Sequence, residues 1–177
     1  IRVLRSVLVI IVLFVPVMVS AQLAPGQYTS KDKKAIRHLN EGRQAVEQHQ
    51  DELAEKSFRK ALDLDNQFIE AALGLANLCQ VTGRHAEAVV YYRKALAINP
   101  RFWSNTYYFL AQSQLTLGQY DDAKTSHEEF LRNERTAIDT RDKAKRLLAN
   151  AEFGSKAIKN PLPIVPVNVG PGINTTQ

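Results

Sequence analysis

Between residues 35 and 137 the hydrophobic positions recur at intervals of three and four, and not at two. This is the spacing of one face of an α-helix, whereas a half-buried strand would alternate with a period of two. The run Leu73, Ala76, Leu78 and Cys79 shows the pattern clearly. We therefore expect an all-α protein, with antiparallel helix pairs and no sheet in this region.

The helical pattern itself repeats after 34 or 35 residues. Four columns carry the repeat: two of small residues, then one of an aromatic or histidine, then one of mostly small residues. The columns are Gly42, Ala76 and Ala111; Ala54, Ala88 and Ala123; Phe58, Tyr92 and His127; and Ala61, Ala95 and Phe130. Turn sequences at 49–50, 83–84 and 118–119 separate the helices of each unit. One such unit cannot bury its apolar face alone, so the units should stack into a curved array.

The second unit carries Ala72-x2-Leu75-Ala76, Gly83, Ala88-x3-Tyr92, Ala95 and Pro100, and it resembles the tetratricopeptide (TPR) repeat family. The resemblance implies a TPR-type helix–turn–helix solenoid with three repeats, at residues 35–68, 69–102 and 104–137. The first repeat is degenerate, because Glu41 stands where the family has Leu and Asn66 where it has Pro. A capping helix with a basic exposed side is expected over residues 138–158.

In TPR proteins the first helix of each repeat lines a concave groove that holds a protein or peptide partner. The resemblance places these residues in the groove here: Asn40, Arg43, Leu73, Asn77, Gln80, Asn105, Tyr108 and Gln112, with Leu39 beside them. Leucine or tyrosine replaces the lysines with which some relatives grip a terminal carboxylate. An extended or helical segment held by amide side chains and Tyr108 fits better. The alternative is a solvated face that binds nothing.

The N-terminal residues have the order of a signal peptide. Arg2 and Arg5 precede an apolar run at 7–19, and small residues end at Ala21. The run is shorter than the roughly 20 apolar residues that span a bilayer. We expect residues 1–21 to be a signal peptide, cleaved before Gln22, rather than an uncleaved anchor. Residues 22–34 then form a lead-in, and the mature chain is periplasmic or outer-membrane-associated.

Residues 159–177 are rich in proline and glycine, so an extended C-terminal tail is expected. Its apolar residues are unusual for a solvated linker. The stretch Pro166-Val-Asn-Val-Gly-Pro-Gly-Ile-Asn-Thr175 is similar to a junction in Bacteroidetes envelope proteins that combine TPR repeats, a TolB-like propeller and an OmpA-like domain. The resemblance implies that a further domain follows. Residues beyond about Val167 should then lack stable contacts within this chain.

Composition and motifs argue against nucleic-acid binding, disulfide bonds, metal sites and catalysis. The formal charge of +5 falls to +3 without Arg2 and Arg5, which is too mild to indicate nucleic-acid binding. The single Cys79 excludes a disulfide framework and a multi-cysteine metal site. The four histidines lack metal-ligand spacing, and no phosphate-binding or nucleophile motif is present. We therefore expect no catalytic residue, cofactor, metal or small-molecule substrate.

The sequence thus predicts a non-catalytic protein–protein interaction scaffold of the bacterial cell envelope, part of a larger outer-membrane-associated assembly. The alternative is a stand-alone periplasmic chaperone accessory, or an enzyme whose repeats hold a substrate. The groove partner and the envelope assembly partners are not identified by any motif.

Overall fold

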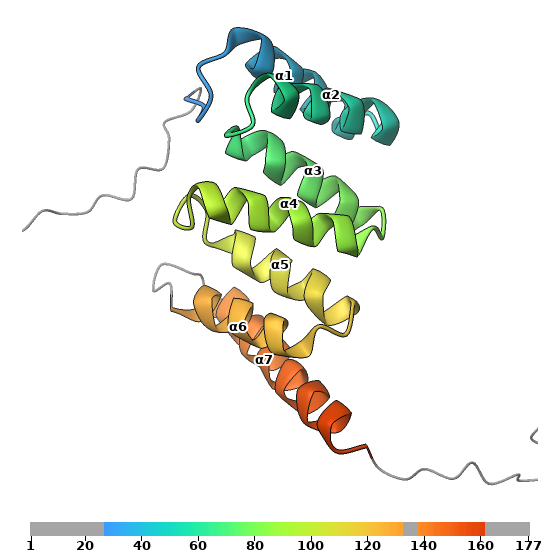
Figure 1. Ribbon diagram of the computed structural model, residues 1–177, viewed down its shortest axis with the longest axis vertical. Helices are drawn as coiled ribbons and strands as arrows, with labels where there is room; N and C mark the ends of the chain where they lie inside the picture. The colour runs from blue at the N-terminus through green and yellow to red at the C-terminus, as the bar shows by residue number, and fades with distance from the viewer. Residues whose placement is uncertain (1–26, 133–137, 162–177) are drawn as a thin grey trace, which may run out of the picture.

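A computed structural model describes residues 27–132 and 138–161, and within these ranges it contains seven helices and no strand (Figure 1). The helices are α1 (Lys33–Glu47), α2 (Asp51–Leu64), α3 (Ile69–Val81), α4 (His85–Ile98), α5 (Asn105–Thr116), α6 (Tyr120–Leu131) and α7 (Ile138–Lys159). The predicted all-α architecture is confirmed. No helix in the described ranges is both long and apolar enough to cross a bilayer.

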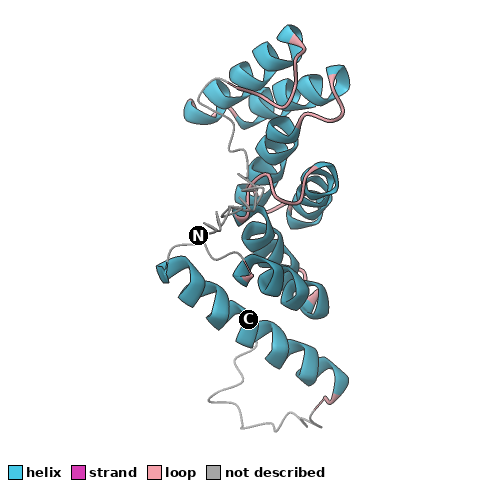
Figure 2. Cartoon of the chain, turned by 90° about the vertical axis from the view of Figure 1, so that its left-hand side faces the viewer, coloured by secondary structure: helices cyan, strands magenta, loops and turns pink. Residues whose placement is uncertain are grey.

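The helices form a stack of pairs. The members α1 and α2, α3 and α4, and α5 and α6 pack most closely, and each pair then rests on the next. Helix α7 packs on α6, touches α5 and closes the far end of the stack (Figures 1 and 2). The expected signal peptide and the tail beyond Pro161 lie outside the described residues.

The turns within the pairs share one geometry, at the positions where the sequence predicts turns. Gly83 and Gly118 have φ angles of 79° and 70°, and His49 takes the same left-handed conformation at 56°. The next residue's amide donates to a carbonyl five residues earlier: Gln50 to Ala45, Arg84 to Cys79, and Gln119 to Gln114. This closing bond satisfies a carbonyl left unpaired at the helix end. The repeated turn keeps the three pairs alike.

The ring of Phe58 holds the first two pairs together. It is buried between Gly42 of α1 and Gly74 of α3. A Cβ atom added at Gly42 would lie 2.6 Å from the ring, and one added at Gly74 would lie 2.9 Å from it. The ring therefore fits only because neither neighbour has a side chain. This contact sets how closely α1 and α3 approach.

Tyr92 occupies the equivalent position in the second pair and adds polar contacts. Its ring is fully buried, and its hydroxyl lies 2.7 Å from Asn77 Oδ1 and 2.9 Å from Gln80 Oε1. Burial raises the pKa of Tyr92, so the phenol stays protonated. The Gln80 amide also donates to the Phe109 carbonyl and to Ser113 Oγ, both at 3.1 Å. Gln80 thus joins α3, α4 and α5.

Helix α7 is attached to α6 by one close contact and one polar cluster. The Tyr120 ring lies against Gly154, where an added Cβ would approach it to 2.5 Å. Asp121 accepts hydrogen bonds from Ser155 Oγ at 2.6 Å and from Lys159 Nζ at 3.0 Å. The outer side of α7 remains exposed and carries Phe153.

We predict that Gly42→Ala destabilises the protein although alanine is the better helix former. Helix propensity favours alanine by about 1 kcal/mol, but overpacking costs about 1–3 kcal/mol. The Phe58 ring cannot move away from the added methyl group because Gly74 lies against it on the other side. The midpoint of urea unfolding should therefore fall. Gln44→Ala, at an exposed site on the same helix, should not lower it. Adding Phe58→Leu should recover part of the Gly42→Ala loss, and failure of that recovery would contradict the contact.

Candidate functional site

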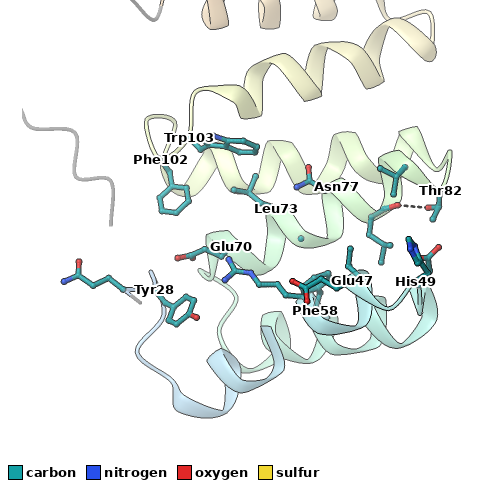
Figure 3. A pocket seen from close by; sticks show the side chains of 17 residues that line it. Tyr28, Glu47, His49, Phe58, Glu70, Leu73, Asn77, Thr82, Phe102 and Trp103 are labelled. Carbon is teal, nitrogen blue, oxygen red and sulfur yellow. Dashed lines mark hydrogen bonds between the residues drawn. The ribbon is translucent and has the colours of Figure 1, made fainter. Parts of the chain in front are cut away.

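A groove of about 960 Å³ lies on the concave side of the first two pairs (Figure 3). Helices α1 and α3 form its floor and sides, and the loop after α4 closes one end with Phe102 and Trp103. The segment before α1 supplies a further wall. Its size is at the upper end of the range for ligand-binding clefts, and its open form suits a polypeptide segment.

Residues 27–30, which we call the strap, form that wall because Thr29 binds the start of α3. The Thr29 hydroxyl accepts a hydrogen bond from the Ile69 amide at 3.1 Å and donates to the Glu70 carboxylate. The Thr29 amide also donates to Glu70 at 3.0 Å. Helix α3 has no side-chain cap of its own, so Thr29 supplies one from about forty residues away in sequence. The strap and α3 are thereby fixed together.

Tyr28 of the strap faces the groove and is held from three sides. Its ring packs edge-on against Phe68, with the centroids 6.2 Å apart. Its hydroxyl donates to Asn40 Oδ1 at 3.0 Å. The Arg43 guanidinium lies over the ring, 5.8 Å from its centroid, within the range of a cation–π contact. The aromatic wall is therefore in place before any partner binds.

The floor and rim of the groove are apolar. Leu73 and Leu78 are buried in the floor next to the edge of Phe58. At the rim, Val46 is 42% exposed and Val81 is 80% exposed. Exposed apolar side chains gathered in one hollow mark interaction sites more often than scattered ones do.

Charged groups in the groove lie mainly on the α1 side. Glu47 and Asp51 line the wall, and neither forms an ion pair among the described residues. Glu70 is already bound to Thr29, and Arg43 faces Tyr28. The groove therefore offers an apolar centre, with both carboxylate acceptors and a guanidinium donor on its α1 side.

Three of the residues expected in the groove line this hollow: Arg43, Leu73 and Asn77. Asn40 stands behind the wall and holds Tyr28, while Gln80 joins the helices instead. Leu39 is fully buried in the core, so the expectation that it faces the groove is wrong. Leu39 belongs to the buried cluster that includes Phe58 and Leu75, at the junction of the first two pairs.

The structure does not bring Asn105, Tyr108 and Gln112 of α5 to this groove. The Tyr108 ring packs against α6, with its centroid 5.3 Å from that of Phe130 and 6.1 Å from that of His127. Its hydroxyl accepts a hydrogen bond from Gln112 Nε2 at 3.2 Å. Phe130 stands where the earlier repeats have alanine, and Tyr108 rests on it. Whether these three residues contact a partner stays a prediction.

The strap and Trp103 are the parts of the site that sequence reasoning missed. Residues 22–34 carry no repeat pattern, and Thr29 meets Glu70 only in the folded chain. Trp103 lies between repeats rather than on a helix face. The one available signal was the aromatic cluster from Trp103 to Phe109.

Clustered metal ligands and reactive thiols are two of the arrangements through which side chains most often carry chemistry. No group of three or more His, Cys, Asp or Glu residues that could hold a metal occurs among the described residues. Cys79 is buried, and desolvation raises the pKa of its thiol, which keeps it a protonated, poor nucleophile.

Two segments match family models of the tetratricopeptide repeat, at residues 69–102 and 104–135. The chain therefore contains TPR repeats, and its fold is an all-α TPR solenoid. No curated protein matches the chain. These similarities lie in the helical repeats and give no support to the resemblance to TolB-like and OmpA-like envelope proteins.

Solved structures with the same fold include TPR domains that hold peptides. The first TPR of Spaghetti (RPAP3) bound to the HSP90 peptide SRMEEVD has a TM-score of 0.60 at 20% identity, covering 72% of this chain and 94% of that one. The TPR2B domain of yeast Sti1 in its pHsp70 complex gives 0.60 at 16%, covering 69% and 98%. The Yersinia enterocolitica type III secretion chaperone SycD with a YopD peptide gives 0.61 at 14%, covering 70% and 96%. At such identities the similarity shows the fold alone.

The third pair contains a buried histidine that should make the protein sensitive to acid. His127 is fully buried, and neither ring nitrogen has a hydrogen-bond partner among the described residues. Desolvation lowers its pKa from 6.5 to about 4. Below pH 6.5 His127 is protonated in the unfolded chain but stays neutral in the folded chain until the pH approaches 4. Stability should therefore be unaffected above that pH and fall by up to about 3 kcal/mol as the pH approaches 4.

Urea unfolding of the wild type and His127→Phe at pH 7.5, 6 and 5 measures this effect. Phenylalanine is the residue at the equivalent position of the first repeat, Phe58, and it cannot take up a proton. The difference in unfolding free energy between variant and wild type should widen as the pH falls below 6.5. An equal difference at pH 7.5 and pH 5 would show that His127 is not shielded from water.

Proposed function

We propose that the chain is a non-catalytic protein-binding module that holds an extended apolar segment of a partner in the groove. The observation that carries the proposal is a preformed hollow with a fixed aromatic wall and an exposed apolar rim. A site that is already ordered loses little conformational freedom on binding. The peptide complexes of proteins with this fold support the same use of the concave side.

Polar groups in the groove are suited to a peptide backbone. The side-chain oxygen of Asn77 contacts Tyr92, which leaves its amide nitrogen free to donate to a carbonyl. Arg43 is a second donor at the wall, and Glu47 is an acceptor. Such groups fix the direction of an extended segment, while Leu73 and Val81 contact its apolar side chains.

We place this module in the bacterial cell envelope, as a scaffold in a larger outer-membrane-associated assembly. The support is the sequence: Arg2, Arg5 and the apolar run at 7–19 are the pattern of an export signal. The similarity of the tail to an envelope-protein junction points the same way.

Selection of displayed random 12-residue peptides on the purified chain tests the binding function. Trp103 is the only tryptophan and lies in the groove, so its fluorescence reports occupancy. We expect the selected peptides to be rich in apolar residues and to shift the Trp103 emission to shorter wavelength. Val81→Lys should weaken their binding about tenfold or more, because it places a charge in an apolar contact.

Val90→Lys is the matched control, because Val90 is also an exposed valine on a helix, α4, but does not line the groove. It should leave peptide affinity unchanged. Peptides that bind without altering Trp103 fluorescence, or that respond equally to both substitutions, would move the binding surface elsewhere.

A further inference from the structure

The sequence after α7 has the chemistry of a ligand for this groove. Residues 161–169 read Pro-Leu-Pro-Ile-Val-Pro-Val-Asn-Val, and no charged residue occurs from Asn160 to Gln177. Proline fixes its own φ angle and disfavours helix in the residue before it. Three such prolines in sequence favour an extended conformation, which lowers the entropic cost of binding in an extended form.

The groove offers what such segments bind. Proline-rich extended peptides dock in hollows lined by aromatic side chains. Here Tyr28 stands on one wall, Trp103 and Phe102 close the end, and Leu73 lies near them (Figure 3), while Val81 lines the groove at the far end of α3. Because the segment has no charged side chain, docking it in the groove would not bury a charge of the ligand.

The chain's own tail cannot fill this groove with those residues. Helix α7 lies at the far end of the stack, packed on α6 and α5, whereas the groove belongs to α1 and α3 (Figure 1). Val165, the middle of the apolar stretch, follows Pro161 by four residues, which extend at most about 14 Å. Between the groove, which reaches the loop after α4, and the end of α7 stand α5 and α6, each about 10 Å across.

We infer that residues 161–169 of one copy dock in the groove of a second copy, so that the chains assemble head to tail. The inference rests on the proposed function, because it names the occupant of the same groove. The contact joins two different surfaces, and every copy keeps a free groove at one end and a free tail at the other. Such contacts build open chains rather than closed dimers.

Sedimentation of the full chain over a range of concentrations, with Trp103 fluorescence in parallel, tests the inference. We expect the mean mass to rise with concentration and the Trp103 emission to shift with it. Val81→Lys, which alters the groove, should weaken association about tenfold or more, and so should Ile164→Asp, which alters the tail. Val90→Lys should associate like the wild type.

Mixing the two defective variants gives the sharpest outcome. Val81→Lys retains an intact tail, and Ile164→Asp retains an intact groove, so together they should form one-to-one pairs and nothing larger. A synthetic peptide of residues 160–170 should bind Ile164→Asp and shift its Trp103 emission. A full chain that stays monomeric, or variants whose mixture stays monomeric, would overturn the inference. If displayed peptides still bind the groove in that case, the proposed function stands without the self-association.

Discussion

The structure depends on one close contact, the Phe58 ring between two glycines. The ring occupies the space where α1, α2 and α3 meet, and it can do so only because Gly42 and Gly74 have no side chains. It therefore sets the distance and angle between the first two pairs. The groove is the concave side of the same junction, and the edge of Phe58 forms part of its floor. The same ring therefore both packs the first two pairs together and forms part of the binding surface.

The equivalent position changes along the stack, and the local function changes with it. Tyr92 adds a hydroxyl that binds Asn77 and Gln80, so the second junction is fixed by hydrogen bonds as well as by packing. His127 forms no such bond among the described residues and instead contacts Tyr108. At the third pair this position is therefore held by packing without a hydrogen bond. Of the three residues, Phe58 is the one that lines the groove.

The sequence was sufficient for the fold because the repeat columns encode helix period, turn and close contact together. Residues such as Ala88 and Tyr92 form the close contacts within and between helix pairs. Because these residue types recur after 34 residues, the period predicts the helix pairs. The groove was predicted only in part. Leu39 follows the same period as Leu73, yet Leu39 is buried in the cluster around Phe58 whereas Leu73 lines the groove, and the period does not distinguish the two. Contacts between segments without a repeat pattern leave no periodic signal.

The central claim is that the concave groove, and not the outer surface, holds the partner. A photo-reactive amino acid at position 81, compared with one at position 90, tests this directly in cells that produce the protein. The account predicts crosslinks from position 81 to an extended apolar segment, mapped by mass spectrometry, and none from position 90. Crosslinks of equal yield from both positions, or from position 90 alone, would contradict it.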